Sequence, residues 1–151
     1  KLDQNTANII ISNISINDLI EQLLKRLRPI AGKRNIELIF ESFRPVMADV
    51  DEVKLSMALN NLIENAIKYG IRKNGNHGTI RLETKQTAEG ICILVKNSGP
   101  GFDEQKINPH HSIQNIRSRM DYLLHGTLII HSQEGVEGTV MELLLPYQNQ
   151  T

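Results

Sequence analysis

The sequence predicts an α+β fold, a two-layer sandwich in which helices cover one face of a mixed β-sheet. The first observation is that apolar residues recur at helical spacing within residues 19–27, 55–66 and 113–124. The second is that other segments alternate apolar and polar residues and are joined by short turn-forming stretches, as in antiparallel hairpins. Helices that lie before and between such hairpins pack against one face of the sheet.

The composition is that of one globular domain over residues 1–151. Hydrophobic residues make up 40% of the chain, and 17 basic residues balance 17 acidic ones, so the formal net charge is +0. Without a basic field, we expect no nucleic-acid partner and no direct membrane contact. The apolar runs are too short to span a bilayer and no leader is recognisable, which predicts an intracellular protein. The single cysteine, Cys92, fits a reducing compartment and is expected to be a small buried side chain.

The first third of the chain predicts a helix followed by short extended segments. Residues 1–8 are polar and are expected to continue an upstream element or to form a loose terminus. Asn17 or Asp18 is expected to cap a helix whose end is marked by Pro29 and Gly32. Alternating apolar residues then predict short strands at residues 36–40 and 46–48.

A central helix follows, for which Asp49 or Asp51 is the expected cap. One stripe of this helix is apolar and repeats at helical spacing, which predicts a face packed on the core. That stripe consists of Leu55, Leu59, Leu62 and Ala66.

The opposite stripe of the central helix is polar. Asn61, Asn65 and Lys68 stand at i, i+4 and i+7, and Tyr69 lies beside them. Two amides, a lysine and a tyrosine on one face suit a magnesium-bound nucleotide. The alternative interpretation is a solvated helix face with a salt bridge between Glu64 and Lys68.

The second half of the chain predicts two hairpins with one helix between them. Ser112 is expected to cap that helix, and Gly126 is expected to end it. The predicted strands are residues 79–86 and 91–96 in the first hairpin, and residues 127–131 and 139–145 in the second.

A break is predicted at residues 97–102, directly after the apolar strand 91–96. Gly99 and Gly101 permit backbone conformations and a close approach that side chains would block, which suits a pocket floor for a flat ring. The alternative interpretation is a simple hairpin turn, for which the sequence Asn-Ser-Gly-Pro-Gly is well suited.

Taken in order, these motifs resemble the histidine-kinase catalytic domain, a member of the GHKL ATPase superfamily with the Bergerat fold. Residues 59–70 (LNNLIENAIKYG) resemble its N box, and residues 97–101 (NSGPG) resemble its first glycine box. Residues 112–120 resemble the helix after the second glycine box, and residues 126–146 resemble the closing strands, with the pair Gly138-Thr139. The resemblance covers nearly the whole chain.

The resemblance assigns the metal and phosphate contacts to the N box. It makes Asn65 the residue that binds magnesium, because Mg²⁺ prefers oxygen ligands and keeps several waters. Asn61 then supports the shell of the metal, and Lys68 reaches the phosphates as a point charge. Tyr69 is placed near the base.

The resemblance assigns the base to the first glycine box and the last strand. The family usually has aspartate where this chain has Asn97, and the amide oxygen of asparagine can accept the same hydrogen bond from the adenine amine. Gly99 and Gly101 form the pocket floor. Thr139 resembles a threonine that contacts adenine through water, although a β-branched residue at the start of a strand is the alternative interpretation.

The second glycine box departs from the family pattern. Where the family often has GxGL, at the end of a short ATP lid, this chain has His110-His111-Ser112-Ile113. Phosphates can still bind the unpaired backbone N–H groups at the start of a helix, so His111, Ser112 and Ile113 belong to the expected nucleotide site. The adjacent histidines could also be interpreted as metal ligands together with His77 or His125.

The function implied by the resemblance is that of the ATP-binding catalytic domain of a two-component sensor histidine kinase, with ATP and Mg²⁺ as cofactors. Such a domain positions Mg-ATP for transfer to a histidine on a separate dimerisation domain of the same protein, which then supplies a response regulator. No histidine here is followed by an acidic residue, so the acceptor is outside this chain and no catalytic residue is assigned. Residues 1–12 are then expected to be a remnant of the dimerisation helix or a linker, and the domain is expected to be cytoplasmic, alone or as the cytoplasmic part of a membrane-bound sensor.

Two other functions fit the same residues. The first is a degenerate GHKL module with weak or no nucleotide binding that acts through protein contacts, a hypothesis motivated by Asn97 and by the missing glycines of the second box. The second is a serine kinase of the anti-sigma-factor type, which has a similar length and N box. The histidine-kinase-like stretch that leads to Asp49 argues against the serine kinase.

Overall fold

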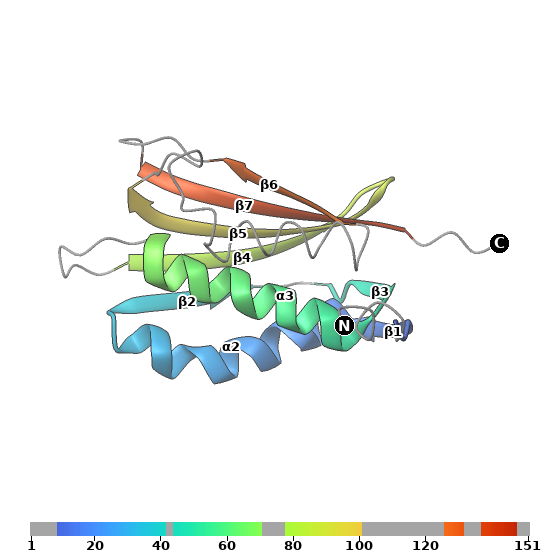
Figure 1. The fold of residues 1–151 in the computed structure, drawn as a ribbon, viewed down its shortest axis with the longest axis horizontal. Helices are drawn as coiled ribbons and strands as arrows, with labels where there is room; N and C mark the ends of the chain where they lie inside the picture. The colour runs from blue at the N-terminus through green and yellow to red at the C-terminus, as the bar shows by residue number, and fades with distance from the viewer. Residues whose placement is uncertain (1–8, 42–43, 71–77, 101–125, 132–136, 148–151) are drawn as a thin grey trace, which may run out of the picture.

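The computed structural model describes residues 9–41, 44–70, 78–100, 126–131 and 137–147 (Figure 1). Among them are a two-stranded sheet of β1 (Ser12–Ser15) and β3 (Met47–Val50), and two α-helices, α2 (Ile16–Gly32) and α3 (Glu52–Asn65). A single π-helical turn, Ala66–Gly70, continues α3. The other strands are β2 (Ile36–Phe40), β4 (Gly78–Gln86), β5 (Gly90–Pro100), β6 (Thr127–His131) and β7 (Glu137–Pro146).

These other strands form one mixed sheet in the order β2-β4-β5-β7-β6. The β2–β4 pair is parallel and the remaining pairs are antiparallel. Both α-helices lie along one face of this sheet (Figure 1). The predicted α+β sandwich with a mixed sheet is therefore confirmed. Neither α-helix in the described part of the chain is long and apolar enough to cross a membrane.

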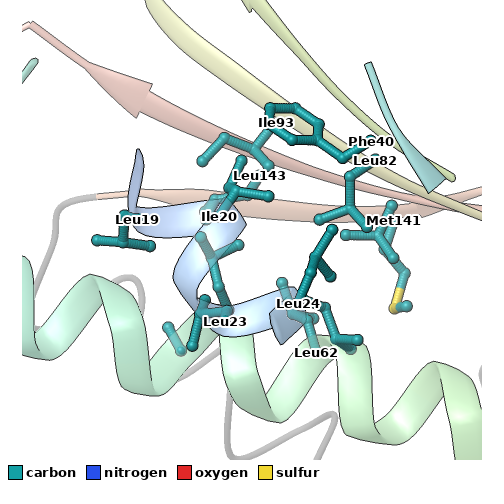
Figure 2. Close-up of a cluster of buried hydrophobic side chains, with 14 of the residues drawn as sticks. Leu19, Ile20, Leu23, Leu24, Phe40, Leu62, Leu82, Ile93, Met141 and Leu143 are labelled. Atoms are coloured by element: carbon teal, nitrogen blue, oxygen red, sulfur yellow. The ribbon is translucent and has the colours of Figure 1, made fainter. Parts of the chain in front are cut away.

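The core lies between the two helices and the inner face of the sheet (Figure 2). Helix α2 contributes one apolar face, including Leu23 and Leu24, which are 1% and 0% exposed. The predicted apolar stripe of the central helix is confirmed, because all four of its residues are buried. The sheet contributes alternate residues of its strands, namely Leu38, Phe40, Ile80, Leu82, Ile91, Ile93, Val95, Leu128, Met141, Leu143 and Leu145.

The start of α2 differs from the prediction. Ser15, rather than Asn17 or Asp18, is the N-cap, and its side chain accepts a hydrogen bond from the backbone N–H of Asp18 at 3.1 Å. Asn17 instead lies inside the helix, where its Oδ1 accepts from the backbone N–H of Val46 at 2.7 Å. This contact joins residues far apart in sequence, so the local cap pattern could not indicate it.

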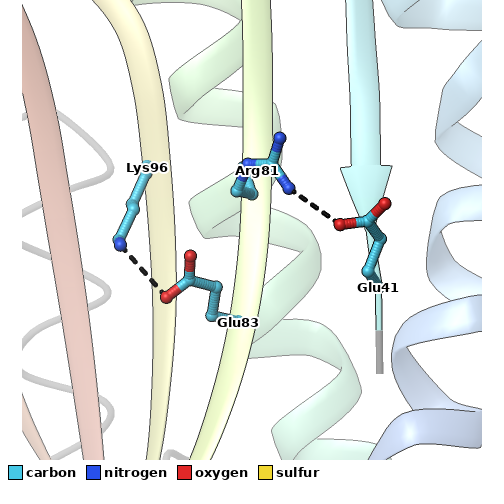
Figure 3. Close-up of polar contacts among 4 residues, drawn as sticks. All are labelled: Glu41, Arg81, Glu83 and Lys96. Atoms are coloured by element: carbon cyan, nitrogen blue, oxygen red, sulfur yellow. Dashed lines mark hydrogen bonds and ion pairs between the residues drawn. The ribbon is translucent and has the colours of Figure 1, made fainter. Parts of the chain in front are cut away.

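The outer face of the sheet carries ion pairs. Arg81 pairs with Glu41 at 3.2 Å, and Lys96 pairs with Glu83 at 3.0 Å (Figure 3). All four side chains are at least one-third exposed, so these pairs contribute little to stability and mainly keep this face polar.

The side chain of Cys92 also lies on the outer face of the sheet, but it is buried there and only 5% exposed. It is buried as predicted, but its thiol donates a hydrogen bond to Glu142 Oε2 at 3.1 Å, which the sequence did not indicate. Burial and this bond to a carboxylate raise the pKa of Cys92 from 9.0 to about 11. The same bond, together with His131, lowers the pKa of Glu142.

Because the thiolate is the reactive form, Cys92 should react slowly with thiol reagents in the folded protein at pH 8. A pKa of about 11 in place of 9.0 corresponds to roughly a hundredfold less thiolate. The rate of modification by a chromogenic disulfide, with and without denaturing urea, measures this difference. Glu142→Gln should speed the folded-state reaction, and a folded wild-type protein that reacts as fast as the unfolded one would contradict the assignment.

Candidate functional site

Helix α3 begins at a carboxylate that is bonded on both oxygens. Asp51 is the N-cap and is 4% exposed, and its Oδ1 accepts from the backbone N–H of Lys54 at 3.0 Å. Its Oδ2 accepts from the backbone N–H of Ile10 at 2.8 Å. Of the two predicted caps, Asp51 is thus the correct one. A negative group also interacts favourably with the helix dipole at this end.

The end of the central helix differs from the prediction. The α-helix stops at Asn65, and a π turn carries the chain from Ala66 to Gly70. In a π turn the hydrogen bonds run from i to i+5, so the α-helical spacing that placed Lys68 at i+7 from Asn61 does not hold beyond Asn65. The predicted continuous α-helical stripe is therefore wrong in its last part, from Asn65 to Lys68.

Asn65 occupies the junction between the α-helix and the π turn. It is 5% exposed, and its Nδ2 donates to the backbone carbonyl of Asn61 at 2.8 Å. This bond fixes the plane of the amide and sets the direction of its Oδ1. Asn61 is half-buried, and Lys68 is exposed.

A second group of candidate residues lies at the end of the sheet. Asn97 on β5 stands directly opposite Thr139 on β7 and opposite Ile80 on β4. Asn97 is 5% exposed and Thr139 is fully buried, and both have the same strand parity as the core residues. This row puts an amide and a hydroxyl side by side in an otherwise apolar inner face.

Strand β5 continues further than predicted. The expected break at residues 97–102 does not begin at Asn97, because β5 runs on to Pro100, which lies opposite Glu137 of β7. The register shifts between Asn97 and Pro100, as at a β-bulge. Beyond the bulge, β7 supplies the partner strand that the turn-forming sequence alone did not predict.

The two groups of candidate residues meet at one end of the molecule. The π turn contacts β5, and the end of α3, the end of β5 and the start of β7 lie on the same side in Figure 1. Gly138 has a φ of 91°, a conformation that favours glycine, and a Cβ there would stand 3.7 Å from the carbonyl oxygen of Asn97. The site thus draws on α3 and its π turn, on β5 and on β7. These elements carry, in that order, Asn65, Lys68, Asn97 and Thr139.

The remaining predicted site residues are described only in part or not at all. Tyr69 lies in the π turn and Gly99 lies in β5. Gly101, His111, Ser112 and Ile113 lie outside the described residues, as do the predicted helix after Ser112 and the lid. Among the side chains that are described, no group of three or more acidic, histidine or cysteine residues could hold a metal.

One contact of the site was missed in the sequence. The Nη1 of Arg34 donates to the backbone carbonyls of Ile67 and Lys68, at 3.1 and 3.4 Å, and so reaches the π turn from the loop after α2. In this loop Asn35, which follows the end of α2, has a φ of 58°. Nothing in that pattern indicates where the guanidinium goes.

The fold is shared with solved catalytic domains of histidine kinases. The catalytic domain of the histidine kinase ThkA superposes with a TM-score of 0.75 at 20% identity, over 91% of this chain and 95% of that one. ThkA in complex with the response regulator TrrA matches with a TM-score of 0.71 at 19% identity, over 91% of this chain and 42% of that one.

The sequence also matches the family described as histidine kinase-, DNA gyrase B-, and HSP90-like ATPase over residues 50–149. The chain belongs to this family. Among curated proteins, the sensor protein LytS of Oceanobacillus iheyensis is 26% identical over 60% of this chain. The sensor histidine kinase ZraS of Escherichia coli is 27% identical over 93% of it. This chain covers only 18% of LytS and 32% of ZraS.

Proposed function

We propose that this chain binds Mg-ATP and is the catalytic half of a two-component sensor histidine kinase. The single observation that carries the proposal is the meeting of the π turn with the end of β5, which brings Asn65 and Lys68 to the end of the sheet where Asn97 and Thr139 lie. A metal-binding amide, a cation and a polar pair for a base are the parts that a bound nucleotide needs.

The chemistry of the donors fits magnesium. Mg²⁺ keeps several waters and is usually held by one or two protein oxygens together with substrate phosphates. Asn65 supplies one neutral amide oxygen on a side chain whose plane is fixed by its bond to the Asn61 carbonyl. When bound, the metal would neutralise charge on the phosphates, and Lys68, which is exposed at the same end, would add a second positive charge.

The base side fits a flat ring with one polar edge. Asn97 lies between Ile80 and Thr139 in an inner row that is otherwise apolar. An amide oxygen can accept a hydrogen bond from an exocyclic amine, and the hydroxyl of Thr139 can bind a water or a ring nitrogen. Asn97 would therefore orient adenine, and the buried position of both side chains would exclude bulk water from that edge.

The partners follow from the same proposal. Phosphoryl transfer needs mainly positioning and charge neutralisation, so an acceptor histidine on a dimerisation domain of the same protein would complete the reaction. ThkA was crystallised with a response regulator, and we propose that a response regulator also receives the phosphoryl group here. The sensor proteins LytS and ZraS, which this chain matches over a minority of their length, support such a multidomain protein.

Titration calorimetry with a non-hydrolysable ATP analogue tests the proposal. Saturable binding is expected in the presence of Mg²⁺, and its affinity should fall on addition of EDTA, because the metal links Asn65 to the phosphates. Amide chemical shifts of the π turn and of the end of β5 should change together. Neither heat nor any chemical-shift change at saturating analogue would overturn the proposal and favour a module that acts through protein contacts.

A further inference from the structure

The loop between α2 and β2, residues 33–35, holds both ends of the segment that follows the central helix. On one side, Arg34 donates to the carbonyls of Ile67 and Lys68 in the π turn. On the other, the backbone carbonyl of Asn35 accepts from the N–H of Gly78 at 2.9 Å, where β4 begins. One short loop is thus hydrogen-bonded both to the π turn and to the start of β4.

The loop is held by hydrogen bonds of its own backbone to the end of α2. The backbone N–H of Arg34 donates to Ala31 at 2.9 Å, and that of Asn35 donates to Gly32 at 3.1 Å. The left-handed conformation of Asn35 then turns the chain into β2, which pairs in parallel with β4. The guanidinium of Arg34 therefore projects from a fixed backbone rather than from a loose loop.

The hydrogen bonds from Arg34 provide partners for backbone carbonyls of the π turn. The last carbonyls of a helix lack partners within the helix, and a cation interacts favourably with that end of the helix dipole. The Nη1 of a guanidinium carries two N–H groups, so this one nitrogen can donate to two successive carbonyls, as that of Arg34 does to Ile67 and Lys68. The backbone of Lys68, on which the position of its ammonium depends, is thus held from outside its own helix.

We propose that Arg34 is a positioning residue for nucleotide binding, which acts by holding the π turn so that Lys68 reaches the phosphates. This inference rests on the proposed function, because it presupposes that Lys68 faces a nucleotide. It goes further in assigning a role to a residue of the loop after α2, outside the N box and the glycine boxes.

The expected result for Arg34→Ala is an affinity for the Mg-ATP analogue that is about three- to tenfold weaker, which corresponds to the loss of one or two ordinary hydrogen bonds. Arg34→Lys should recover part of the loss, because it keeps the charge and the donors but places them on a compact ammonium instead of a planar group. Arg28→Ala is the matched control. Arg28 lies on α2 and, like Arg34, donates to a backbone carbonyl, that of Leu38 at 3.4 Å, but this carbonyl is on β2. The affinity of the Arg28→Ala variant for the Mg-ATP analogue should equal that of the wild type.

A double-mutant cycle distinguishes positioning from a merely structural role. If Arg34 acts through Lys68, then Arg34→Ala should weaken binding much less in a Lys68→Ala background than in the wild type. Equal losses in both backgrounds, or wild-type affinity in Arg34→Ala, would overturn the inference.

Amide hydrogen exchange without nucleotide gives a readout that does not depend on binding. Exchange at residues 66–70 should be faster in Arg34→Ala than in Arg28→Ala, while the melting temperatures of the two variants stay similar. Absence of nucleotide binding by the wild-type protein would refute the proposed function itself. Normal wild-type binding with unchanged exchange in Arg34→Ala would refute only the role of Arg34.

Discussion

Asn65→Ala should lower the affinity for a Mg-ATP analogue by at least about a hundredfold, because it removes the only N-box oxygen that is assigned to the metal. The variant also loses the bond from Nδ2 to the Asn61 carbonyl, which is expected to cost only about 1 kcal/mol of folding stability. Calorimetry at matched protein concentrations measures the affinity, and a thermal melt confirms that the variant is folded.

Asn60→Ala is the matched control for this experiment. Asn60 is a neighbouring amide on α3, but its Oδ1 accepts from Arg26 at 3.2 Å, on the side of α2. Its substitution should leave nucleotide affinity unchanged. In EDTA, Asn65→Ala and the wild type should bind the analogue equally, because the lost contact is to the metal. An Asn65→Ala protein that binds Mg-ATP with wild-type affinity would show that the metal assignment is wrong.

Gly90→Ala should destabilise the protein by about 3 kcal/mol and lower the melting temperature by roughly 10 °C. Gly90 begins β5 and lies opposite Pro146 at the end of β7. A Cβ at this position would overlap the carbonyl oxygen of Leu145 and would stand 2.8 Å from the Cα of Pro146. Both neighbours are backbone atoms of the adjacent strand, so no side-chain rotation relieves the clash.

Gly32→Ala provides the comparison, since it adds the same methyl group at the end of α2, where a Cβ has nothing within 4 Å. Alanine favours a helix over glycine, so this variant should be as stable as the wild type or more stable by up to about 1 kcal/mol. Urea denaturation of both variants measures the difference. If Gly90→Ala were as stable as Gly32→Ala, the close approach of β5 and β7 at this point would be wrong.

Much of the fold could be predicted because its signals are local. The alternation of Ile36, Leu38 and Phe40 reflects one buried strand face, and the carboxylate of Asp51 caps the helix that starts at the next residue. The failures come from tertiary contacts. Ser15 caps α2 because Asn17 is engaged by Val46, and β5 continues through turn-forming residues because β7 pairs with it.

In the candidate site, too, local features could be predicted from the sequence, and features that depend on tertiary contacts could not. The residue types of the N box could be recognised in the sequence, but the burial of Asn65, which is 5% exposed, could not be predicted from the polar stripe. The pairing of Asn97 with Thr139 depends on strand register, which no single segment specifies. The contact between Arg34 and the π turn joins residues that are more than thirty positions apart, so periodicity within the helix could not indicate it.

The two oxygens of Asp51 have a mechanical consequence. One oxygen fastens the segment that contains Ile10, and the other starts α3, whose last residue is Asn65. A helix of 14 residues is about 21 Å long and behaves as a stiff rod. Residues 9–11, which lead into β1, are therefore bonded to the first end of α3, and Asn65, the residue that we propose binds magnesium, lies at its last end. A displacement of residues 9–11 would therefore act on α3 along its axis, towards the residue that we propose binds magnesium.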